Sequence, residues 1–82
     1  MMTLRYYPHM QVYTKKAEEA LALSTVGDAL RHVKAAYGAD ALREAKASLI
    51  VVNNTSIELL KGRKTILRDG DTLAFLPLCG GG

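Results

Sequence analysis

The chain has 82 residues, of which 49% are hydrophobic and 23% are charged, a composition typical of one small globular domain. A domain of this size builds a single small core, which argues against an enzyme that must enclose a deep active site on its own. The net charge of +3 is scattered along the chain and forms no basic block, so it does not indicate a nucleic-acid partner.

Membrane, disulfide and metal-dependent classes are also disfavoured. No unbroken apolar run approaches the length of a membrane span, and the first residues lack the apolar core of a secretion signal. The single cysteine, Cys79, cannot form an internal disulfide, and together with two histidines it makes no metal-binding signature. We therefore expect a cytoplasmic protein with no metal site and no membrane partner.

The N-terminal part predicts two short strands. The β-favouring residues 4–7 predict the first, and Pro8 ends it because proline cannot donate a hydrogen bond to a sheet. Residues 8–16 are expected to connect it to the next element. Residues 19–23 alternate loosely and predict a second strand, although residues 17–22 could form a helix on propensity alone.

One main helix is predicted to begin at Thr25. The threonine oxygen can accept from the third helical amide, and Asp28 lies at the positive end of the helix dipole. Gly38 is expected to close this helix in a left-handed conformation. Residues 39–46 predict a second, shorter helix with Ala39, Leu42 and Ala45 on its apolar side. In the main helix, apolar side chains recur at spacings of three and four and predict one buried stripe: Val26, Ala29, Leu30, Val33 and Tyr37.

The second half of the chain predicts the remaining strands. The continuous apolar, β-branched run over residues 48–53 is typical of a strand buried on both faces, and we expect it to be the central strand. Residues 55–60 follow as its hairpin partner and residues 61–64 as a polar loop. Asp69-Gly70-Asp71 predicts a turn with a positive φ at Gly70, and residues 72–76 predict a last strand.

Together these elements predict an α+β protein with a ubiquitin-like β-grasp fold. Its mixed sheet would have about four to five strands, with the main helix packed across one face and the first and last strands as parallel neighbours. Pro77 ends the last strand. The domain is expected to cover residues 1–77, and residues 78–82 to form a flexible tail.

The chain ends in three glycines, Gly80, Gly81 and Gly82, for which folding gives no reason. They pack nothing and have maximal conformational entropy. From composition alone, a frayed end or a remnant of an expression tag explains them as well as a function does.

Residues 52–55 and 69–82 resemble the MoaD/ThiS family of β-grasp sulfur carriers, most closely the branch of the small subunit of molybdopterin synthase. In that family a Val-Asn strand end, an Asp-Gly-Asp turn leading into a strand and a proline, and a terminal Gly-Gly follow in this order. The resemblance implies that the reactive group is the carboxylate of Gly82. An E1-like enzyme adenylates it with ATP, and sulfur then replaces the adenylate to leave a thiocarboxylate.

The same resemblance implies the partners. The catalytic subunit of molybdopterin synthase would take the sulfur into the dithiolene of the pterin, so this chain would be a protein cosubstrate, not an enzyme. It would bind no cofactor, and ATP would be used in the site of the activating enzyme. Gly81 and Gly82 lack side chains and could enter a narrow channel, to which Gly80 adds reach. The residues expected to contact partners beside the tail are Phe75, Leu76, Pro77, Leu78 and Cys79.

Alternatives to these assignments remain open. Phe75 alternates with Leu73 and could belong to the core, and Cys79 could be a small apolar residue without a role. The basic residues of one segment could form a solvated loop or dock to an acidic groove of the activating enzyme: Lys61, Arg63, Lys64 and Arg68. No base and nucleophile pair is predicted among the two histidines and the serines: His9, His32, Ser24, Ser48 and Ser56.

Alternative functions also remain open. The carrier could serve thiamine synthesis or another sulfur-transfer pathway. It could instead be a ubiquitin-like modifier whose Gly82 forms an isopeptide with a lysine, or a β-grasp interaction domain that is never activated.

Overall fold

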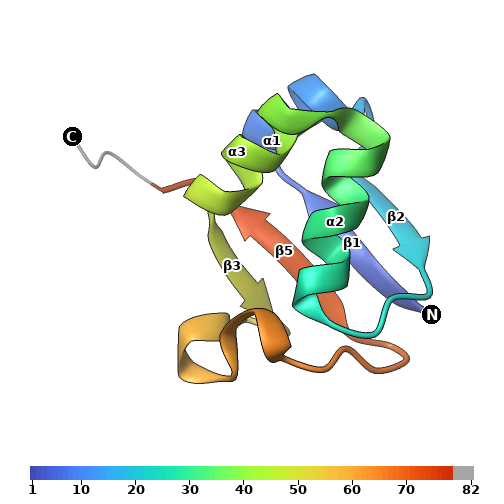
Figure 1. The fold of residues 1–82 in the computed structure, drawn as a ribbon, viewed down its shortest axis with the longest axis vertical. Helices are drawn as coiled ribbons and strands as arrows, with labels where there is room; N and C mark the ends of the chain where they lie inside the picture. The colour runs from blue at the N-terminus through green and yellow to red at the C-terminus, as the bar shows by residue number, and fades with distance from the viewer. Residues whose placement is uncertain (79–82) are drawn as a thin grey trace.

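The computed structural model describes residues 1–78, and its centre is a pair of parallel strands from the two ends of the chain (Figure 1). Strand β1 (Met2–Tyr6) lies beside β5 (Thr72–Leu76), with Leu4 opposite Leu73 and Tyr6 opposite Phe75. The chain forms a β-grasp, and the predicted parallel pairing of the first and last strands is confirmed.

Three further strands complete the mixed sheet. Strand β2 (Glu18–Leu21) pairs antiparallel with β1, while β3 (Leu49–Val52) pairs antiparallel with β5. The short β4 (Thr55–Ser56) pairs antiparallel with β3, which gives the order β2-β1-β5-β3-β4. Strand β5 therefore occupies the centre, and the prediction that residues 48–53 form the central strand is wrong. An apolar run of this kind requires only an inner position, and β3 has one, because β5 and β4 lie at its two edges.

The helices cover one face of this sheet (Figure 1). Helix α2 (Val26–Tyr37) begins with the predicted cap: Thr25 Oγ1 accepts from the Asp28 amide at 3.1 Å, and Asp28 Oδ2 accepts from the Thr25 amide at 3.2 Å. Gly38 ends α2 with a φ of 99°, the positive value predicted, but its ψ of 175° lies outside the left-handed helical region. Helix α3 (Ala39–Ala47) follows directly.

Alternate side chains of the sheet and one stripe of each helix form the core. Leu4, Leu73 and Phe75 are fully buried, and the ring of Phe75 stacks on that of Tyr6 at a centroid distance of 6.0 Å. The predicted stripe of α2 is buried except for Tyr37, which is half-buried. This packing fixes the position of β5.

Residues 8–16, predicted to be a connection, contain a helix. Helix α1 spans Pro8–Thr14, and Pro8 occupies its first turn. Proline at that position favours a helix, because its fixed φ suits the first turn and no helical bond requires its missing amide. The helix is held by burial of Met10 and Thr14, which are one turn apart.

The buried face of α3 and the extent of β4 also differ from the prediction. In α3 the buried side chains are Ala41 and Ala45, whereas Ala39 is exposed, because a helix this short can turn either of two neighbouring stripes to the core. The hairpin partner predicted over residues 55–60 is a strand only at β4. Its remainder forms the 3₁₀ turn η1 (Ile57–Leu59), and a second turn, η2 (Gly62–Lys64), follows.

Candidate functional site at the end of strand β5

The candidate site lies where β5 ends and the chain leaves the domain. Phe75, the last but one residue of β5, is fully buried and anchors the strand from inside the core. Leu76 lies opposite Leu49 of β3 and is half-buried. Pro77 is exposed, and Leu78 is 64% exposed. A firmly held strand thus leads directly into surface residues.

Exposed or half-buried apolar groups gather at this point, and we call them the tail-base surface: Leu49, Leu76, Pro77 and Leu78. Leu49 is 40% exposed, although it pairs with the strand that carries the tail. Phe75 does not contribute, because it lies in the core, as the alternation with Leu73 favoured. The remaining predicted site residues lie outside the described part of the chain: Cys79, Gly80, Gly81 and Gly82.

The face of the sheet that the helices leave open extends to the tail-base surface. Val51 and Ala74 are buried but lie outside the core cluster, because their side chains point to this open face. With Arg5, Tyr7 and Leu76 they line a groove of about 240 Å³. Of these groove residues, only Leu76 was among those expected from the sequence to contact partners. The alternation of residues 72, 74 and 76 with the buried Leu73 and Phe75 was the signal that could have identified them.

The two motifs that carried the family resemblance meet at the other end of β5. Asn53 donates from Nδ2 to Asp71 Oδ1 at 2.9 Å, and its Oδ1 accepts from the Thr72 amide at 3.0 Å. Gly70 has the predicted positive φ, at 86°. The Arg68 amide and the Asn53 side chain both donate to Asp71 and lower its pKa. These residues fix the register of β5 and are not part of a catalytic group.

The hairpin between β3 and β4 explains the Asn-Asn sequence. Asn53 and Asn54 have φ values of 49° and 70°, as both central residues of a two-residue hairpin turn of type I′ require. Asparagine tolerates this conformation better than most residues.

A histidine and a serine lie together where α1 meets the end of α3, but they do not form the base and nucleophile pair that the sequence also gave no reason to expect. His9 Nε2 lies 2.8 Å from Ser48 Oγ, and Ser48 Oγ lies 2.8 Å from the carbonyl oxygen of Glu44, to which it donates. Because the serine proton is used there, Nε2 of His9 must be the donor to Ser48. The pair therefore ties α1 to the end of α3 and does not resemble a base that activates a nucleophile.

Other chemistry is not assembled in the described part of the chain. Over residues 1–78, no three His, Cys, Asp or Glu side chains gather as a metal ion would require. In the same range, no helix combines the length and apolar character needed to cross a bilayer.

Comparisons with known proteins agree with this geometry. The sequence model of the ThiS family matches residues 5–82, which includes the terminal glycines. No curated protein sequence matches the chain.

Solved structures show the same fold. A structure of the BexX/CysO complex of Amycolatopsis orientalis matches with a TM-score of 0.82 at 20% identity, covering 100% of both chains. CysO of Mycobacterium tuberculosis matches with 0.78 at 21% identity, covering 94% of this chain and 98% of that one. Small archaeal modifier protein 1 of Methanosarcina acetivorans matches with 0.78 at 23% identity, covering 99% and 95%.

Proposed function

The chain belongs to the ThiS family of small ubiquitin-like sulfur carriers, and from this premise we propose that it carries sulfur as a thiocarboxylate on Gly82. Carriers of this family are not catalysts, so the chemistry is done by the enzymes that bind them. The observation that carries the proposal is the family match through Gly82, on a chain whose anchored β5 leads into the exposed Pro77 and Leu78.

The reaction follows from the chemistry of a carboxylate. Its oxygen is a poor leaving group, so the activating E1-like enzyme joins the carboxylate to the α-phosphate of ATP and releases pyrophosphate. A sulfide donor then attacks the acyl carbon, AMP leaves, and the carbon retains one oxygen and one sulfur. All these steps take place in the partner's site, and this chain supplies only its end.

Binding to the activating enzyme is assigned to the tail-base surface and the adjoining open face of the sheet. Leu49, Pro77 and Leu78 give an apolar contact beside the reacting end, and Arg5 adds a charge at the rim. Because Phe75 anchors β5 in the core below, an enzyme that binds this surface also holds the strand from which the reacting end extends.

Within this function, we place the carrier in the synthesis of molybdopterin, as the small subunit beside the catalytic subunit of the synthase. This finer assignment is supported by the resemblance of residues 52–55 and 69–82 to that branch and by the length of the chain. Incubating the thiocarboxylated chain with a molybdopterin synthase catalytic subunit and with a thiazole synthase, each with its own substrate, would distinguish the two pathways. Sulfur transfer only to the thiazole would refute the molybdopterin assignment.

The proposal is tested by intact-mass spectrometry. The chain is incubated with the E1-like enzyme of its cell, ATP and a sulfide source, beside a variant that lacks Gly82. We expect the exchange of one oxygen for one sulfur in the full chain and not in the variant. A lysine conjugate without sulfur would replace the carrier function by a modifier function. If the mass of the chain stays unchanged with an enzyme that activates a known carrier, the chain is a β-grasp interaction domain that is not activated.

A further inference from the structure

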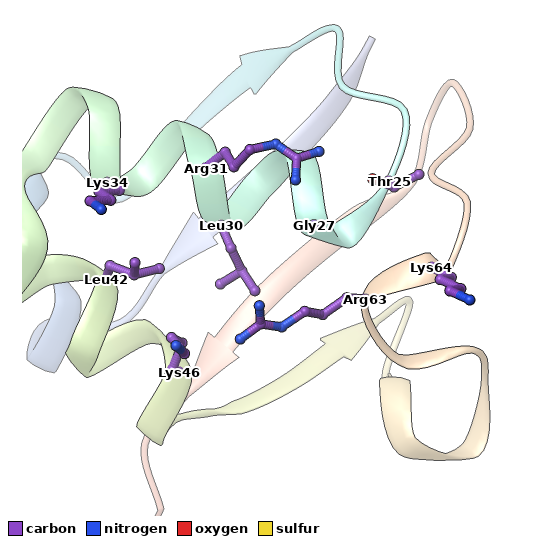
Figure 2. A pocket seen from close by; sticks show the side chains of 9 residues that line it. All are labelled: Thr25, Gly27, Leu30, Arg31, Lys34, Leu42, Lys46, Arg63 and Lys64. Carbon is purple, nitrogen blue, oxygen red and sulfur yellow. The ribbon is translucent and has the colours of Figure 1, made fainter.

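A hollow on the helical side of the molecule is surrounded by cations (Figure 2). It has a volume of about 420 Å³ and lies between α2, α3 and η2. Leu30 and Leu42 form its apolar floor, and Thr25 and Gly27 lie at one end. Five cationic side chains complete the lining: Arg31, Lys34, Lys46, Arg63 and Lys64. None of the nine lining residues is acidic.

Most of these charges have no partner in the protein. Arg31 pairs with Asp28. Within residues 1–78, the other four cations take part in no ion pair. Arg63 extends from η2 across the hollow toward Leu30 and Lys46, so its charge lies over the apolar floor (Figure 2). The hollow therefore holds an excess of positive charge that the fold does not compensate.

Folding explains only part of this arrangement. Lys34 and Lys46 lie in the last turns of α2 and α3, where cations interact favourably with the helix dipole. Arg63 and Lys64 lie on a 3₁₀ turn of three residues and receive no comparable benefit. Bringing them beside the helix cations adds repulsion, which destabilises the folded chain.

The shape and chemistry of the hollow indicate a peptide and not a nucleic acid. None of the lining residues is aromatic, so no platform exists on which a base could stack. An apolar floor beneath a ring of cations instead complements an aliphatic side chain that is flanked by carboxylates. The aliphatic stems of Lys34, Lys46 and Arg63 would add to the apolar contact.

We propose that this hollow binds an acidic segment of a partner protein, with one apolar side chain on Leu30 and Leu42 and carboxylates on the surrounding cations. The hollow lies on the face of the sheet that carries the helices, whereas the groove beside Val51 and Ala74 lies on the open face. A partner bound here leaves the groove on the open face free, so a second protein can bind there at the same time. Binding of an acidic segment in this hollow does not require that Gly82 carry sulfur.

The test uses the full chain labelled with nitrogen-15 and three blocked pentapeptides. The first has leucine between two pairs of glutamates, the second has alanine in place of leucine, and the third has glutamine in place of every glutamate. We expect the first to shift the amide signals of Gly27, Leu30 and Arg63 and to bind several-fold more tightly than the second. The third should cause no shifts, and added salt should weaken the first.

Paired charge reversals assign the site. Arg63→Glu should weaken binding of the first peptide about tenfold, since a repulsive charge replaces an attractive one at the centre of the hollow. Lys61→Glu makes the same change of net charge one residue before η2 but outside the hollow, and it should retain affinity to within about twofold. Both variants are exposed-site changes, and an unchanged urea midpoint verifies that they fold.

Three outcomes would overturn the proposal. The first is equal weakening by the two charge reversals, which would indicate attraction by net charge alone. The second is equal affinity for the leucine and alanine peptides, because the apolar floor would then have no role. The third is a single-stranded oligonucleotide that shifts the same amides at physiological salt while the peptides do not, which would make the site a nucleic-acid contact.

Discussion

Replacing Glu19 by glutamine is expected to lower the free energy of unfolding at pH 7 by about 2 kcal/mol, because hydrogen bonds to a charged acceptor exceed those to a neutral one. Three donors converge on Glu19 Oε2: Tyr6 Oη at 2.5 Å, Tyr37 Oη at 2.7 Å and His32 Nε2 at 3.1 Å. They join the edge strand β2 to β1 and α2. The carboxylate side chain is only 14% exposed, so water cannot readily take its place.

Related substitutions should follow a fixed order. Glu19→Ala is expected to cost about 3 kcal/mol, because it leaves the hydroxyl of the buried Tyr6 without its acceptor. Tyr6→Phe should cost only about 1 kcal/mol, since Glu19 keeps two other donors. Total stability for such a domain is on the order of 5–15 kcal/mol, so the glutamine variant should melt on the order of 10 °C lower.

The same carboxylate should make stability depend on pH. Burial alone would raise the pKa of Glu19, but hydrogen bonds from Tyr6, Tyr37 and His32 together hold it below its ordinary value of 4.5. The folded pKa is thus lower than the unfolded one, so this contribution is fully present above the unfolded pKa. It is lost as the pH falls through the folded pKa. The difference between wild type and Glu19→Gln should therefore be largest near neutrality and shrink under acid conditions.

Urea unfolding followed by circular dichroism at pH 7 and at several acid pH values measures both effects. Glu18→Gln is the matched control, because the neighbouring Glu18 is 56% exposed and within residues 1–78 pairs only with Arg5, at 3.6 Å. An exposed pair of this kind contributes about 0–1 kcal/mol. A cost of Glu19→Gln no larger than that of Glu18→Gln, or a cost that is the same at every pH, would contradict this role of the Glu19 carboxylate.

Three further predictions concern the tail, the backbone and the core. Leu78→Asp should slow thiocarboxylation about tenfold in the activation assay. Leu59→Asp, at a site 79% exposed on η1, is the control and should not slow it. Equal rates for the two variants would show that the tail-base surface is not part of the interface. Gly38→Ala should lose about 1–3 kcal/mol to strain at its positive φ, although its new methyl group meets nothing within 4 Å. Gly27→Ala, with ordinary contacts and no positive φ, is the control, and a similar loss there would contradict the backbone explanation. Phe75→Ala should cost about 3–5 kcal/mol in urea unfolding, and a cost below about 1 kcal/mol would show that β5 is not anchored by the core.

Local signals in the sequence predicted the elements that depend on neighbouring residues. The cap at Thr25 and the positive φ at Gly70 were identified because each is set by bonds or sterics within a few residues. The same holds for the end of β5 before Pro77. Helix α1 was missed although Pro8 is a recognised first-turn residue, since proline also ends strands and only the packing of Met10 distinguishes the two.

By itself, therefore, the sequence determined the family, the β-grasp class and the terminal glycine on which the proposed chemistry takes place. The tertiary structure alone decided that β5 is central, that Glu19 receives three donors, and that Arg63 faces the cations of α2 and α3. These features join residues far apart in the chain. Their pairing is chosen by the packing of the whole core, and no local pattern encodes it.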